Sequence, residues 1–230
     1  MEKINDVNAK YEDLKKQYLH DLTSNSDDKD VISKALECAL DTRKFEITLY
    51  WKRAAYFWAF IGAIFTAYFA LQKPILSDHE LLLGIIVVGY IFTWCWYLVN
   101  RGSKYWQENW EMHVDMLEDS VMGSLHKTVK NPRSLRFYKL FNGYPFSVTK
   151  INQVLNVTVL IVWAILFFKE LPIVFNHIYT DTIPLLGLIF LISISIIISI
   201  ITRSKLPRHE ENSMYTSSKS EIVKKYSTKE

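Results

Sequence analysis

Cysteine is scarce in this sequence. Its 230 residues include only two cysteines, Cys38 in a polar segment and Cys95 in an apolar run. Two cysteines so far apart provide neither the spacing of a metal site nor a disulfide framework. The sequence also lacks the HExxH pattern, the glycine-rich phosphate loop and the nucleophile elbow. These absences remove the usual signs of an enzyme, and we predict no cofactor and no metal and identify no small-molecule substrate.

Charged residues are missing from four long apolar runs, at residues 54–72, 81–99, 154–168 and 183–201. About 20 apolar residues are needed to cross the hydrocarbon core of a bilayer, and three of the runs have about that length. Inside a bilayer every backbone polar group must be bonded within the chain, so such runs form helices. The sequence therefore predicts an all-α polytopic membrane protein, with transmembrane helices at 54–72, 80–99, 153–168 and 183–202.

Lysine and arginine are nearly absent from the two short connections between these runs. Residues 1–53 carry ten of them, residues 101–153 carry eight and residues 203–230 carry seven, which leaves only Lys73 and Lys169. Because positive charge is retained on the cytoplasmic side, both termini and the middle connection are predicted to be cytoplasmic. Outside the membrane the chain is thus divided into N-terminal helices at 1–53, an amphipathic helix with a return loop at 100–152, and a disordered tail at 203–230.

Glycine and proline are missing between Lys29 and Gly62. A helix that begins near residue 29 is therefore expected to run without a break into the first membrane span. Before it, residues 1–22 carry apolar side chains at the 3-4-3-4 spacing of a coiled-coil seam, namely Ile4, Val7, Tyr11, Leu14 and Tyr18. Such a helix either pairs with other copies or packs on its own chain, and the spacing alone favours neither.

The stretch NRGSKYWQENWEMHVDMLED, at residues 100–119, directly follows the second apolar run. Four side chains recur in it at helical spacing while the acids fall mostly on other faces: Trp106, Trp110, His113 and Leu117. The second span is thus predicted to continue past Gly102 as an amphipathic helix. The acids argue against nucleic acid as a partner, which needs a basic stripe, and against lying on an anionic membrane. We expect the four recurring side chains to pack on protein, including neighbouring copies, and the acids to be exposed.

A metal site could be drawn in the same region from His113, Asp115, Glu118 and His126. Their spacing matches no familiar ligand motif, and His113 lies on the aromatic face of the predicted helix. A packed, hydrogen-bonded histidine is therefore the favoured interpretation.

Small residues recur every four positions along the first span, at Ala55, Ala59, Ala63 and Ala67. Such a stripe lets two helix backbones approach closely, which is how membrane helices associate. We therefore predict that these alanines form a packing face for the oligomer. The opposite surface is expected to face lipid, and it carries Phe57, Phe60, Ile64 and Phe65.

The segment that returns the chain to the membrane, residues 130–150, is basic and aromatic. Its cations Arg133, Arg136 and Lys139 could contact anionic lipid head groups. The alternative, which we favour, is that they are ordinary positive charges of a cytoplasmic loop.

Three blocks of the sequence carry a resemblance to a known family. They are EITLYWKRAAYFWAF at 46–60, YLVNRGSKYWQENWEMHVDMLED at 97–119 and FSVTKIN at 146–152. These blocks are similar to the recurring blocks of the RipA-family octameric membrane proteins, which are small proteins of the bacterial inner membrane. The resemblance implies a homo-octamer with a role in envelope function or adaptation. It implies no established reaction and no catalytic residues.

The residues and the resemblance together predict a non-enzymatic homo-octamer of the bacterial inner membrane that acts as a pore, a scaffold or an envelope-adaptation factor. One alternative is a membrane enzyme that acts on lipid, with His113 and Asp115 at the bilayer surface. Another is a defence effector that perforates the membrane. Burial of Trp106 and Trp110 between subunits would favour a structural role, whereas a pocket at His113 and Asp115 open to lipid would favour the enzyme.

Overall fold

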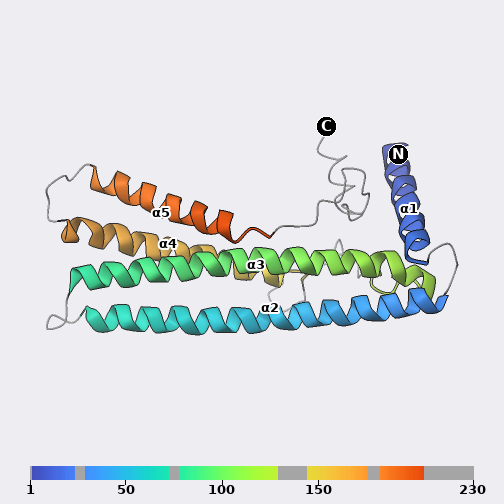
Figure 1. Cartoon of the computed structure of the whole chain (residues 1–230), viewed down its shortest axis with the longest axis horizontal. Helices are drawn as coiled ribbons and strands as arrows, with labels where there is room; N and C mark the ends of the chain where they lie inside the picture. The colour runs from blue at the N-terminus through green and yellow to red at the C-terminus, as the bar shows by residue number, and fades with distance from the viewer. Residues whose placement is uncertain (1, 24–28, 73–77, 129–143, 176–181, 205–230) are drawn as a thin grey trace. The chain divides into compact units, whose positions relative to one another are not determined.

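The computed structural model of the chain describes residues 2–23, 29–72, 78–128, 144–175 and 182–204. These residues form five helices and no strand (Figure 1): α1 (Glu2–Thr23), α2 (Lys29–Leu71), α3 (His79–Val121), α4 (Val148–Val174) and α5 (Ile183–Ile201). The last four are long and apolar enough to cross a membrane. The prediction of an all-α polytopic membrane protein is therefore confirmed.

Two of the helices each contain a polar and an apolar segment without a break between them. α2 has 43 residues and runs through the glycine- and proline-free stretch before Gly62, as predicted. α3 also has 43 residues and passes through Gly102. A single glycine weakens a helix by only about 1 kcal/mol relative to alanine, which is too little to interrupt a helix of this length.

α4 extends beyond the predicted span at 153–168 in both directions. It begins after Ser147, whose hydroxyl accepts a hydrogen bond from the Lys150 backbone N–H at 3.4 Å. At the other end the helix continues through Glu170, which is buried although its side chain is a carboxyl group. Its carboxylate lies 3.0 Å from Nδ1 of His79, so the acid has a partner where the apolar run has ended.

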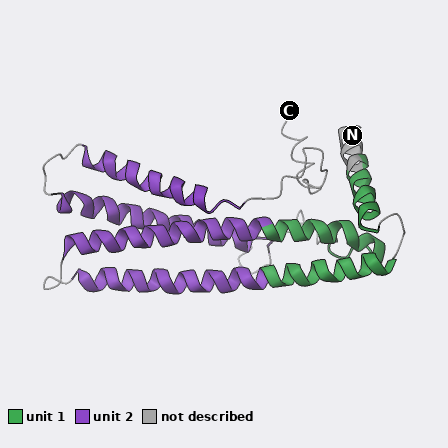
Figure 2. Ribbon diagram, viewed as in Figure 1, with its two compact units in different colours: residues 1–46, 106–136, 205–230 green, residues 47–105, 137–204 purple. Residues whose placement is uncertain are grey.

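The chain is divided into two compact units (Figure 2). Unit 1 consists of residues 1–46, 106–136 and 205–230, and unit 2 of residues 47–105 and 137–204. Within the described residues, unit 1 contains α1, the beginning of α2 and the end of α3. Unit 2 contains the apolar parts of α2 and α3, together with α4 and α5.

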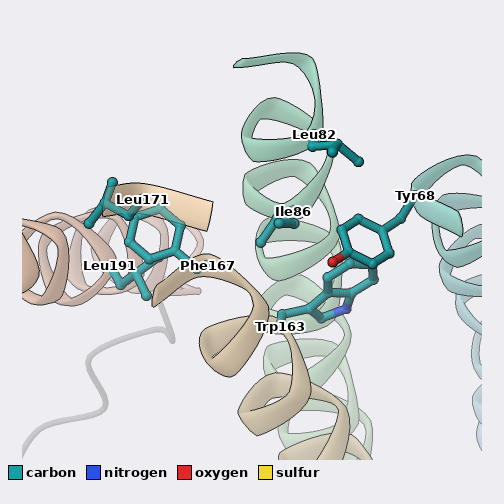
Figure 3. Close-up of a cluster of buried hydrophobic side chains, with 7 residues drawn as sticks. All are labelled: Tyr68, Leu82, Ile86, Trp163, Phe167, Leu171 and Leu191. Atoms are coloured by element: carbon teal, nitrogen blue, oxygen red, sulfur yellow. The ribbon is translucent and has the colours of Figure 1, made fainter. Parts of the chain in front are cut away.

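The core of unit 2 is an apolar cluster to which all four of its helices contribute (Figure 3): Tyr68, Leu82, Ile86, Trp163, Phe167, Leu171 and Leu191. Trp163 is fully buried, and the ring of Phe65 stacks on it with the centroids 4.1 Å apart. A Cβ added to Gly89 would lie 2.6 Å from this indole, so the ring rests against the bare backbone of α3. The missing side chain at position 89 is what allows α3 and α4 to approach here.

α5 is joined to α3 by hydrogen bonds inside unit 2. The hydroxyls of Tyr90 and Ser195 lie 3.0 Å apart. The indole N–H of Trp94 donates to the Ser195 carbonyl at 3.1 Å and to the Ser199 hydroxyl at 3.2 Å. Serines in this otherwise apolar helix thus connect helices, as polar side chains in membrane proteins commonly do.

The close contact at Gly89 gives a first prediction. Gly89→Ala should destabilise the protein by about 1–3 kcal/mol, because an indole held between α3 and Phe65 cannot yield to the new methyl group. Gly84→Ala is the matched control in the same helix, since its added Cβ would meet no atom within 4 Å. The control should be neutral, or stabilising by up to about 1 kcal/mol. Thermal unfolding in mild detergent would measure both, and equal midpoints would rule out the tight contact.

Candidate functional site

The four side chains predicted to pack on protein lie at the end of α3, in unit 1, and differ in exposure. Leu117 is 1 % exposed and belongs to an apolar core with Ile32, Leu36, Ala39 and Val114. Trp110 is half-buried against the same core. Trp106 keeps 40 % of its surface exposed. Leu117 and Trp110 therefore stabilise their own chain, whereas Trp106 is only partly covered by it.

His113 is packed and hydrogen-bonded within the chain. Its Nδ1 lies 2.9 Å from the hydroxyl of Tyr18, and its ring centroid lies 5.2 Å from that of Trp110. Burial lowers the pKa of His113 and raises the pKa of Tyr18, so both side chains are neutral near pH 7. The Tyr18 O–H can then donate to an unprotonated Nδ1. This is the arrangement favoured from the sequence.

Glu108, Glu111 and Asp119 are exposed, as the sequence suggested, but Asp115 and Asp119 are also bonded within unit 1. The Tyr11 hydroxyl donates a hydrogen bond to Asp115, and Lys15 donates one to Asp119. Lys127 also donates to Asp119, at 2.6 Å. Burial alone would raise the pKa of Asp119, but the hydrogen bonds from Lys127 and Lys15 lower it to about 2. These acids therefore attach α1 and the turn after α3 to α3 itself.

The expectation that the acids of α3 are exposed was wrong for Glu118. Its side chain is 0 % exposed, and its Oε2 accepts from the backbone N–H of His126 at 3.0 Å and lies 2.9 Å from Nδ1 of the same residue. Gly123, with a φ of 75°, ends α3 and turns the chain back. Its N–H bonds the Glu118 carbonyl at 3.0 Å, which satisfies a carbonyl of the last helical turn. Glu118 and His126 are brought together by this turn, which helical periodicity does not predict.

The seam of α1 packs within the chain. Tyr11 and Leu14 are buried, and Tyr18 packs on the unit 1 core. For Ile4 and Val7 the structure describes the helical backbone and not the side chains. For the described part of the seam, the contacts favour packing on its own chain over pairing with other copies.

The predicted alanine face of α2 lies in unit 2, and Ala55, Ala59, Ala63 and Ala67 are all exposed. The buried face of the helix is formed instead by Ala54, Ile61 and Tyr68. Phe65 and Ile64 also pack on the unit 2 core, so the expectation that they face lipid was wrong for these two residues. Periodicity could not separate the two faces, because this part of α2 is apolar all around.

Two further groups of residues were considered in the sequence, the basic residues of the return segment and a possible metal site. The proposed lipid-contacting cations Arg133, Arg136 and Lys139 lie outside the described residues. Within the described ranges, no group of three or more His, Cys, Asp or Glu side chains is positioned to hold a metal ion. The residues that the structure does bring together in unit 1 are those of a packed helical subdomain.

The four apolar helices α2 to α5 define a multi-pass, all-helical membrane protein. A family model described as the octameric membrane protein family (8xMP) matches residues 33–172. This match covers more than half of the chain, which therefore belongs to that family. No curated protein and no solved structure matches the chain.

The buried carboxylate gives a second prediction. Glu118→Ala should cost about 1–3 kcal/mol of stability, because it removes the buried side chain whose Oε2 bonds the backbone N–H of His126 and lies beside its ring. Glu111→Ala is the matched control on the same helix, since its 3.3 Å pair with Arg43 is exposed. A surface pair of this kind contributes about 0–1 kcal/mol. Thermal unfolding of both variants checks this, and a Glu118→Ala midpoint no lower than the control would contradict the burial of the carboxylate.

Proposed function

We propose that this chain forms a homo-octamer in the bacterial inner membrane and acts, without catalysing a reaction, as a pore, a scaffold or an envelope-adaptation factor. The observation that carries the proposal is the exposed alanine face of α2 in a chain that belongs to the octameric membrane protein family. The resemblance of three sequence blocks to the RipA-family proteins supports the bacterial origin and the octamer. The charge distribution supports cytoplasmic termini.

The alanine face is suited to contact with a second copy. Its four alanines follow one another at one-turn spacing, and Gly62 and Thr66 beside them are exposed as well. Small side chains bring no advantage against lipid tails, but they let two helix backbones pack closely. The rest of the subunit uses the other side of α2, through Ile61 and Tyr68. The alanine face is therefore best suited to pack against a helix of a neighbouring subunit.

The contacts of unit 1 support a structural role over catalysis. An enzyme acting on lipid would need His113 and Asp115 available to a substrate. Nδ1 of His113 is bonded with Tyr18, and Asp115 accepts from Tyr11 and lies 3.5 Å from Nζ of Lys127. Both side chains are engaged in holding α1 against α3. The perforating defence effector is a variant of the pore and would share the same assembly.

Assembly should therefore depend on the alanine face. Ala59→Leu or Ala63→Leu should break the octamer while membrane insertion is retained, since leucine inserts readily but keeps two helices apart. Ala59→Ser is the matched control, because it keeps the side chain small and should leave the assembly intact. The mass of the purified complexes in mild detergent distinguishes the variants. If both leucine variants keep the mass of the wild type, α2 faces lipid and the proposed interface is wrong.

The topology is tested separately. A reporter active only outside the cytoplasm should be active when it is fused after Gln72 or Phe175, because the connection following α2 carries only Lys73 and the one following α4 carries no Lys or Arg. The same reporter fused after Thr128 or Ser204 should be silent. The opposite pattern would show that the termini lie outside the cytoplasm.

A further inference from the structure

A layer of buried polar side chains lies between helices of unit 2. It consists of Tyr50, Thr93, Trp96, Asn100, Asn152 and Asn156, all of which are buried. The Asn152 amide donates to the Tyr50 hydroxyl at 2.6 Å and to Oδ1 of Asn100 at 3.4 Å. The Asn156 amide donates to the Thr93 carbonyl at 3.4 Å. These contacts connect α2, α3 and α4 by hydrogen bonds through what is otherwise an apolar bundle.

Three polar atoms of this layer have no hydrogen-bond partner in the part of the chain that the structure describes. They are the indole N–H of Trp96, the amide nitrogen of Asn100 and Oδ1 of Asn156. Trp96 lies between Thr93 and Asn100 on the buried face of α3, and Asn156 bonds to that same face. Two donors and one acceptor without partners are therefore found among the side chains of this buried layer. Buried polar groups in native proteins are almost always paired with protein or with ordered water.

The burial of these residues limits what can pair with them. Trp96 and Asn156 are 0 % exposed, so neither a lipid head group nor a neighbouring subunit can reach their side chains. The layer contains no charged side chain, and its two donors are unfavourable for a metal cation. A small neutral molecule that both accepts and donates hydrogen bonds fits this set of atoms. Water has those properties, and buried water typically makes about three hydrogen bonds to such groups.

The other half of the interface between α3 and α4 is apolar. Along its buried face, α4 continues from Asn152 and Asn156 to Leu160, Trp163 and Phe167. The indole N–H of Trp163 also lacks a partner among the described residues. It lies in the cluster of Figure 3, where the one polar group is the Tyr68 hydroxyl, which accepts from Gln72 at 2.7 Å. A water molecule there would find too few polar neighbours.

We infer that the polar layer is a binding site for internal water, which reaches between α3 and α4 as far as Asn156 and is stopped by Trp163. The water accepts from the N–H groups of Trp96 and Asn100 and donates to Oδ1 of Asn156. Because Thr93, Trp96 and Asn156 lie in the apolar, membrane-crossing helices, hydration extends into the membrane-spanning part of each subunit. The site belongs to one subunit and does not depend on the octamer.

The two buried tryptophans provide an internal comparison. The full-length protein, with 15N-labelled tryptophan, would be placed in lipid nanodiscs and transferred to D2O, and the indole N–H signals would be followed by NMR. The Trp96 N–H should exchange faster than the Trp163 N–H by at least about tenfold, a factor that corresponds to ~1.4 kcal/mol. Global unfolding would expose both equally, so it cannot produce this difference. Equal rates, or faster exchange at Trp163, would overturn the inference.

A variant tests whether the acceptor holds the water. Asn156→Leu should slow the exchange of Trp96 by about tenfold, to the range of Trp163, because it removes the acceptor and fills the site. Thr158→Val is the control on the same helix, since Thr158 is exposed and bonds only the carbonyl of Val154 among the contacts resolved. Unchanged exchange in a folded Asn156→Leu protein would refute the assignment of the site. If that variant does not fold, the wild-type comparison of the two indoles decides the question alone.

Discussion

The indole of Trp163 rests directly on the backbone of α3 at Gly89, and the arrangement of unit 2 depends on this contact. Phe65 of α2 stacks on the same ring, so three helices meet at one side chain. A second glycine, Gly187 in α5, is covered in a similar way by Leu171, whose side chain lies 2.5 Å from where a Cβ would be. In lipid no hydrophobic force draws helices together, so the fit of such contacts determines which faces associate.

Unit 1 is held together by an apolar core and by hydrogen bonds between charged side chains. It has an apolar core around Leu36 and Leu117, and charged groups fasten its edges. Asp119 accepts hydrogen bonds from Lys15 of α1 and from Lys127 of the turn after α3. Glu118 is buried and contacts His126. The acids of α3 thus serve to close this unit. Asp115 is bonded in the same way by Tyr11 of α1.

Each unit has a distinctive exposed surface. In unit 2 the alanine face of α2 is exposed although the opposite face of the same helix is packed, and it is the face that we propose for contact between copies. In unit 1 the exposed part of Trp106 is a large aromatic surface of the kind common at interfaces. The buried polar layer is separate from both surfaces. It gives each subunit hydrated, hydrogen-bonded contacts in one half of its helix interface and a dry contact at Trp163 in the other.

The sequence by itself determined the class of the protein, the four membrane-crossing helices and the continuity of α2 and α3. These follow from local rules: runs without charge must be helical in lipid, and a helix without proline continues. It also predicted a packed His113 correctly, because helical spacing placed that ring on the aromatic face. Only the tertiary structure decided which side of α2 is buried, since an apolar helix has no polar face to mark its outside. The burial of Glu118 likewise required the turn at Gly123, and the unpaired groups of the polar layer required knowing which atoms of α3 and α4 meet. Such contacts join residues far apart in the chain, and no periodicity within one helix encodes them.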